Sequence, residues 1–207
     1  MAPAGQPRPP VTRDRIGEAA LDILDGSRDE SALTMRRLAT VLGVQAPSLY
    51  AHVTGIDDIL GLVHRRINSA IDLAVAEDPD PLDGLRRLAR SYRWAYARHQ
   101  VAAAAIIMRS INADHALAVY EAAAHCLHRA GVPSDRIMAA LAMLDYVTLG
   151  SALEPFAAGF VGPARSYRAH YPVLAGALAQ SRRRHLDDEG FELGLEAFVD
   201  VVRRLAA

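Results

Sequence analysis

The stretch that decides the fold lies near the N-terminus and reads TMRRLATVLGVQAPSLYAHV over residues 34–53. Thr34 is a predicted N-cap, and the apolar positions after it share one helical face until Gly43 ends the helix. A second short helix follows the turn at 43–45 and carries Pro47 in its first turn, where proline is tolerated. Two short helices joined by a glycine-bearing turn of this length are typical of a helix-turn-helix.

The same stretch has a local charge that differs from the rest of the chain. Between Thr34 and Ile56 there are two arginines and no acid, so a DNA phosphate would meet no repulsion there. The second helix of such a pair enters the major groove, whose base edges suit Gln, Ser and Arg side chains. The residues predicted to contact DNA are Thr34, Arg36, Arg37, Gln45, Ala46, Pro47, Ser48, Tyr50 and His52. Spacing alone leaves open that Leu49 and Tyr50 belong to a core and that the arginines form a solvated face.

The segments around this motif divide the chain into four predicted parts. Residues 1–11 are rich in proline and read as a flexible arm. Residues 12–56 form the predicted helix-turn-helix domain, and a helical pattern at 57–76 forms a connecting helix. The sequence at 77–81 breaks that helix and is the best boundary in the chain. An alanine-rich block at 82–207 follows, which we expect to bind a ligand and to form a dimer.

The helical periods favour an all-α fold of about ten helices. Within the C-terminal block they predict helices at about 82–98, 101–110, 114–131, 134–158, 172–182 and 190–205, with no convincing strand. Such a helical bundle is large enough to hold a largely apolar cavity with a few polar groups.

The composition is that of a globular protein. The 207 residues are 51% hydrophobic and carry a net charge of only -1, which excludes a disordered chain and shows no global preference for nucleic acid or membrane. Cys126 is the only cysteine, so no intrachain disulfide can form and a reducing compartment is expected. No signal peptide is evident, and the longest apolar stretch, Val101–Met108, is far shorter than a bilayer span. We therefore expect a soluble, cytoplasmic protein without a membrane partner.

A longer pattern carries a family resemblance. It reads Thr34-x-x-x-Leu38-Ala39-x-x-Leu42-Gly43-Val44-x-x-x-Ser48-Leu49-Tyr50-x-His52-Val53 within residues 12–60. This region resembles the DNA-binding domain of the TetR (tetracycline-repressor) family. More weakly, Val147–Glu154 and Phe191–Glu196 are similar to C-terminal segments of the repressor after which the family is named. The resemblance implies an all-α homodimer that a small molecule releases from a palindromic double-stranded DNA operator.

The resemblance also implies which residues bind ligand and partner. Candidates for an apolar or aromatic effector are Tyr92, Trp94, Tyr96, Met108, Arg109, Tyr120, Met143, Tyr146 and Glu154, although any one of them could be ordinary core. The predicted dimer interface contains Leu149, Phe191, Leu195, Phe198 and Val202. Two departures matter. The family histidine that helps to hold magnesium–tetracycline falls in Val101–Met108, which has none, and a phosphate-binding lysine is replaced by Ile56. Arginines 8, 13 and 15 could supply the missing phosphate contact.

Other kinds of site are not favoured. The set His125-Cys126-x-His128 has a spacing that could bind metal, but it is common by chance, so we predict no metal and leave its role open. No phosphate loop, nucleophile elbow or catalytic carboxylate pair is evident, so we predict neither a cofactor nor an enzyme. The alternative is a helical small-molecule-binding protein or enzyme whose helix-turn-helix is only scaffold. An activator cannot be separated from a repressor by sequence.

Overall fold

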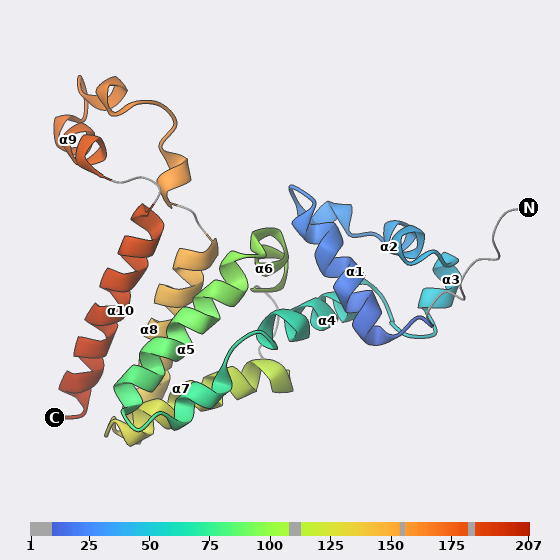
Figure 1. Ribbon diagram of the computed structural model, residues 1–207, viewed down its shortest axis with the longest axis horizontal. Helices are drawn as coiled ribbons and strands as arrows, with labels where there is room; N and C mark the ends of the chain where they lie inside the picture. The colour runs from blue at the N-terminus through green and yellow to red at the C-terminus, as the bar shows by residue number, and fades with distance from the viewer. Residues whose placement is uncertain (1–9, 108–112, 154–155, 182–184) are drawn as a thin grey trace, which may run out of the picture. The chain divides into compact units, whose positions relative to one another are not determined.

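The computed structural model describes residues 10–107, 113–153, 156–181 and 185–207. These residues form ten α-helices and four short 3-10 helices, with no strand among them, which confirms the all-α prediction (Figure 1). The chain divides into two compact units. The first consists of residues 1–70 and 99–115, and the second of residues 71–98 and 116–207.

The first unit is built around the helix that precedes the helix-turn-helix. Its elements are α1 (Arg13–Asp25), η1 (Glu30–Ala32), α2 (Met35–Leu42), α3 (Ala46–Leu49), α4 (Ile56–Asn68), α6 (Gln100–Ile107) and the first residues of α7 (Asp114–Arg129). Helix α1 packs on α4, α2 and α6, and its apolar face is buried from Ile16 to Leu24. The close approach to α4 needs Gly17, because a Cβ there would lie 3.0 Å from the Cβ of Leu62.

The second unit is a bundle in which α5, α8 and α10 run side by side (Figure 1). Its elements are η2 (Leu73–Glu77), α5 (Pro81–Ala97), the rest of α7, α8 (Ser134–Leu153), η3 (Phe156–Gly159), η4 (Ala164–Tyr167), α9 (Pro172–Gln180) and α10 (Leu186–Leu205). Helix α5 lies so close to η2 that a Cβ at Gly84 would stand 2.6 Å from the carbonyl oxygen of Val75. This contact fixes the N-terminal end of α5 within the unit.

The sequence predicts one helix over residues 57–76, but the structure has two separate segments there. Helix α4 ends at Asn68, and η2 begins at Leu73. Local side-chain bonds account for the break: Ser69 Oγ donates to the carbonyl of Arg66, and the Asp72 carboxylate accepts the N–H of Ala74. Such bonds compete with helical backbone pairing. Residues 99–115 group with the first unit, whereas the composition break had suggested a boundary near 82.

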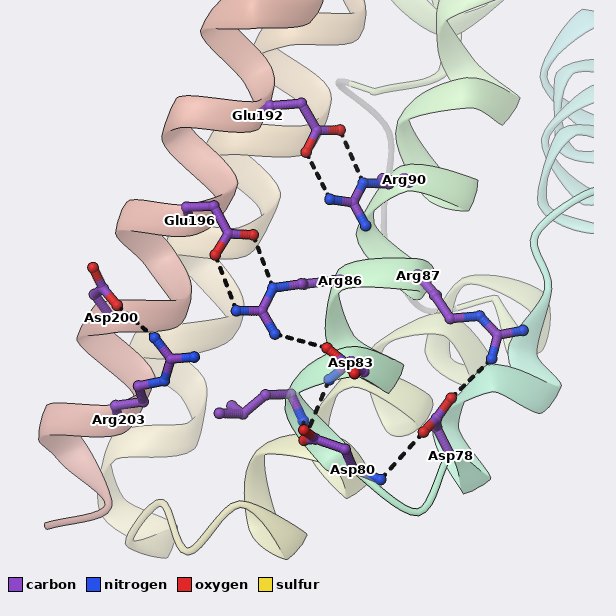
Figure 2. Close-up of polar contacts among 11 residues, drawn as sticks. Asp78, Asp80, Asp83, Arg86, Arg87, Arg90, Glu192, Glu196, Asp200 and Arg203 are labelled. Carbon is purple, nitrogen blue, oxygen red and sulfur yellow. Dashed lines mark hydrogen bonds and ion pairs between the residues drawn. The ribbon is translucent and has the colours of Figure 1, made fainter.

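A row of ion pairs joins α5 to α10 (Figure 2). Arg86 pairs with Glu196 at 2.8 Å, Arg90 with Glu192 at 2.7 Å and Arg93 with Asp188 at 2.8 Å. The residue numbers rise along α5 as they fall along α10, so the two helices are antiparallel and the pairs fix their register. The Arg93 guanidinium also lies 4.8 Å from the ring centroid of Phe191.

We expect Arg86→Met to lower the free energy of unfolding by about 1–2 kcal/mol, because its guanidinium bonds two carboxylates while only 15% of its side chain is exposed. In a double-mutant cycle with Glu196→Gln, measured by urea unfolding, the coupling energy should be about 1 kcal/mol. Arg203→Met, which breaks an exposed pair with Asp200, is the matched control and should change stability by less than about 0.5 kcal/mol. Equal losses in both variants would contradict a special role for the α5–α10 row.

One described helix, α8, has the length and hydropathy of a bilayer span, with 33% of its most apolar window buried in the structure. Length and composition alone are weak support for a span, because helices of soluble bundles pass the same test. Helix α8 packs on α5 and α10 and carries Asp145 bound to two tyrosine hydroxyls.

Candidate functional site

The helix-turn-helix has the geometry that its sequence indicates. Thr34 caps α2, with its Oγ1 accepting the N–H of Arg37 at 3.1 Å. Gly43 ends α2 in the left-handed region, at φ 70° and ψ 33°, where a side chain would be strained. The N–H of Val44 then bonds to the carbonyl of Ala39 at 3.0 Å, which closes the turn. Helix α3 starts directly after this turn.

Two apolar side chains anchor the recognition segment and leave its polar side chains exposed. Leu49 has no exposed surface and Val53 is 2% exposed, whereas Tyr50 is 60% exposed. Leu49 is therefore core and Tyr50 is not, which answers the question that spacing left open. Of the predicted DNA contacts, the exposed ones are Thr34, Arg36, Arg37, Gln45, Pro47, Ser48 and Tyr50, and the half-buried ones are Ala46 and His52.

The recognition helix is shorter than its sequence pattern indicates. Helix α3 ends at Leu49, so Tyr50 and His52 lie in the turn that follows it. The N–H groups of His52 and Val53 both bond to the carbonyl of Leu49, which tightens the chain there. Tyr50 and His52 still lie next to α3, the segment that would enter a groove.

Arg13, the first residue of α1, forms hydrogen bonds with that turn. Its guanidinium donates to Asp58 at 2.5 and 3.1 Å and to the carbonyl of His52 at 2.5 Å. Asp58 also accepts the N–H of Thr54, and these donors hold the pKa of the Asp58 carboxyl below its usual value. Arg13 is thus engaged within the chain, and its contact with a phosphate stays a prediction. Arg15 donates to the carbonyl of Pro10 at 2.7 Å, and Arg8 lies outside the described residues.

Two histidines meet where α4 packs near the start of α7. The rings of His64 and His115 are nearly perpendicular, with centroids 4.6 Å apart. Asn68 on α4 donates to the carbonyl of His115 at 3.2 Å. Burial, together with the neighbouring His115, lowers the pKa of His64 to about 4. The pKa of His115 is also lowered, by burial and by the charge of Arg65, while the charge of Asp114 acts to raise it.

The His64 pair predicts a loss of stability in acid. Its folded pKa of about 4 lies below the usual histidine value of 6.5, so the unfolded chain takes up the proton first as the pH falls. The native state should lose up to about 3 kcal/mol between pH 6.5 and pH 4. Urea unfolding across this range should show His64→Gln losing less stability than the parent protein, while His128→Gln, at an exposed position, behaves like the parent. Parallel pH profiles for all three proteins would contradict the assignment.

A polar group in the second unit joins three helices. Asp145 of α8 accepts the hydroxyl of Tyr92 from α5 at Oδ1 and the hydroxyl of Tyr120 from α7 at Oδ2, each at 3.0 Å. Burial raises the pKa of Asp145 above its usual value and that of Tyr120 to about 12. Tyr92 and Tyr120 were predicted from the sequence, but Asp145 was not. A lone acid within the apolar run of α8 was the available signal.

The other predicted effector residues are spread around this group. Tyr96 is buried and lies edge-on to Tyr92, with ring centroids 5.2 Å apart, and Met143 is half-buried. Tyr146 is 77% exposed, so the structure does not bring it together with the two buried tyrosines. Trp94 is 53% exposed and stacks under the guanidinium of Arg98, 4.2 Å from its ring centroid. Three further predictions, Met108, Arg109 and Glu154, lie outside the described residues.

The predicted interface residues are core residues of the single chain. Leu149, Phe191, Leu195, Phe198 and Val202 are all buried, with exposures of 8% or less. A side chain that its own chain covers has little surface left for a partner, so the expected interface needs correction. Two apolar residues of the same helices are exposed instead, Tyr146 on α8 at 77% and Leu193 on α10 at 74%. A groove of about 720 Å³ is lined by Val147, Gly150, Ser151, Phe156, Leu186, Asp187, Gly190, Phe191 and Gly194.

The histidine and cysteine set on α7 does not converge. The Cys126 thiol is fully buried and lies 3.8 Å from the carbonyl oxygen of Ala76, and burial raises its pKa. His125 instead faces Glu77, at 3.6 Å. Across the described ranges, no three His, Cys, Asp or Glu side chains are grouped as metal ligands.

Comparison with known proteins gives a consistent result. Residues 77–204 match the family model described as "Tetracyclin repressor-like, C-terminal domain". The HTH-type transcriptional repressor DrrR1 of Streptomyces coeruleorubidus is 28% identical, over 99% of this chain and 82% of its own length. An HTH-type transcriptional regulator of Saccharopolyspora erythraea is 30% identical, over 82% of this chain and 75% of its own. The solved structure of the TetR family protein ActR of Streptomyces coelicolor with actinorhodin is 27% identical and has a TM-score of 0.78. That match covers 96% of this chain and 98% of the ActR chain.

Proposed function

The chain belongs to the TetR family of ligand-responsive, DNA-binding transcriptional regulators, and from this premise we propose that it is a homodimeric repressor that a small aromatic or apolar molecule releases from a palindromic operator. The name of DrrR1 supports repression, and the bound actinorhodin of ActR supports an aromatic effector. A cytoplasmic regulator without enzymatic activity fits this role.

The exposed recognition surface carries the proposal. Leu49 and Val53 are buried beneath it, so Gln45, Ser48 and Tyr50 are held on the outside of the domain with no acid nearby in the sequence. A scaffold helix-turn-helix would have no need to keep these side chains uncovered. We assign DNA binding to residues 12–56, the connection to 57–76, and effector binding and dimerisation to 82–207.

The exposed face of α8 and α10 is the proposed dimer surface. Tyr146 and Leu193 form its apolar part, and Gly190, Gly194 and Ala197 are small residues on α10 beside them. A two-fold axis brings the same face of both subunits together. In such a dimer the half-sites of the operator lie about one helical turn, roughly 34–36 Å, apart or a multiple of it. An effector that favours another spacing of the recognition helices weakens binding by its differential affinity for the two states.

Selection from a random double-stranded DNA library tests the function directly. We expect the purified full chain to enrich a palindromic sequence and to bind it with an affinity that falls steeply as salt rises. Arg36→Ala and Arg37→Ala should each reduce the salt slope by about two, because the dimer loses one phosphate contact in each subunit. Enrichment of no sequence, or binding that is indifferent to salt and to both substitutions, would favour a scaffold role.

A further inference from the structure

The second unit contains a carboxylate whose charge is not balanced by any described cation. Asp145 is half-buried between α5, α7 and α8, and its two hydrogen-bond donors are neutral tyrosine hydroxyls. Throughout the described ranges, no arginine or histidine lies within 4.0 Å of it. An ionised carboxylate away from water is costly unless it is paired. A cationic group placed beside this carboxylate would therefore stabilise its charged form.

We propose that Asp145, held in place by Tyr92 and Tyr120, receives a protonated amine of the effector. This inference rests on the proposed function and defines its ligand as a cationic aromatic amine. Each tyrosine occupies one carboxylate oxygen, and a carboxylate has about four acceptor positions, so positions remain for an ammonium donor. The two hydroxyls also fix the direction in which those free positions point.

The surrounding rings favour the same class of ligand. Tyr92 and Tyr96 lie edge to face, with ring centroids 5.2 Å apart, and both are almost fully buried. Aromatic faces attract cations electrostatically, by about 0.5–2 kcal/mol when the site is dry. A ligand that brings a cation and an aromatic body would satisfy the carboxylate and extend the aromatic packing. An anionic ligand would place two negative charges together.

The competing explanation is that the three side chains only tie α5, α7 and α8 together. In that case the loss of Asp145 would change stability and would affect ligands of every charge equally. A charge-selective site behaves differently, because only the affinity for a cation depends on the carboxylate. The two explanations therefore separate in a comparison of ligands that differ in charge and little else.

Calorimetric titration with matched tricyclic probes provides that comparison. The probes are 9-aminoacridine, acridine and acridine-9-carboxylate, which are cationic, neutral and anionic at neutral pH. A second series uses naphthylmethylamine, naphthylmethanol and naphthoate. We expect the full chain to bind the cation of at least one series about tenfold or more tightly than its neutral partner. Asp145→Asn should abolish this preference, whereas Asp200→Asn, which removes an exposed carboxylate near the end of α10, should retain it.

Several results would overturn the inference. One is the absence of a cation preference from both probe series, whether or not the probes bind. Another is a cation preference that survives in Asp145→Asn. A preference that appears only in Arg109→Gln would also contradict it, since the chain's own arginine would then hold the carboxylate. Operator binding is measured on the same samples. Intact operator binding without charge preference rejects only this inference, while a protein that selects no DNA sequence rejects the proposed function.

Discussion

Replacing Tyr50 by alanine is expected to weaken operator binding by about 100-fold without changing the fold. Tyr50 is 60% exposed and lies immediately after α3, so its hydroxyl and ring are free to contact DNA. A groove or phosphate contact is worth about 1–2 kcal/mol, and a two-fold dimer loses it twice. Exposed side chains contribute little to stability, so the free energy of unfolding should stay within about 0.5 kcal/mol of the parent value.

The neighbouring Leu49 provides the matched control. Leu49→Ala removes a side chain with no exposed surface and should cost about 2–5 kcal/mol of stability, together with operator binding. Mobility-shift titrations and urea unfolding on the same preparations distinguish contact from scaffold. Tyr50→Phe then divides the Tyr50 effect between hydroxyl and ring. If Tyr50→Ala binds operator like the parent protein, the recognition surface lies elsewhere on the first unit.

Leu193→Glu is expected to convert the dimer to monomers and to reduce operator affinity by about 1,000-fold. The substitution places a carboxylate on the proposed face of α8 and α10, and a two-fold dimer would bury two such charges. Sedimentation velocity gives the mass, and circular dichroism gives the helix content. The helix content should be unchanged, because Leu193 is 74% exposed in the single chain.

Two comparisons make the Leu193 result specific. Leu195→Glu buries the same charge in the core of the chain and should unfold the second unit, because Leu195 has no exposed surface. Leu117→Glu, at a 48% exposed apolar position on α7, should leave both mass and operator binding unchanged. A Leu193→Glu protein that sediments as a dimer would place the interface on another surface.

Local signals predicted the helix-turn-helix closely. Helix α1 begins after the Thr12 cap, and α2 spans the residues between Thr34 and Gly43, because caps and a left-handed glycine act within a few residues. The connecting helix was predicted less well. Apolar periodicity continues past Asn68, but side-chain bonds from Ser69 and Asp72 interrupt the backbone there. Periodicity indicates which face is buried and does not determine where such bonds end a helix.

The sites show a similar division between local and distant information. The family resemblance predicted Tyr92 and Tyr120 as effector residues, but their meeting at Asp145 depends on the packing of three helices. The family resemblance predicts the interface residues, and the apolar spacing of Phe191, Leu195, Phe198 and Val202 on the last helix is compatible with it. The apolar spacing identifies the side of α10 that packs against its own chain. On α10, the exposed large apolar residue is Leu193, which has small residues near it in the sequence. A single sequence does not state which of two apolar faces belongs to a partner.

The stacking of Trp94 under Arg98 has a practical consequence for spectroscopy. Trp94 is the only tryptophan in the chain and lies two residues after Tyr92 on the same helix. Selective excitation of the indole therefore reports on one place in the protein, close to the proposed ligand. Emission quenching and lifetime would follow any change at the C-terminal end of α5 in real time, with no label attached. If the effector binds beside Tyr92, Trp94 emission is expected to change on binding.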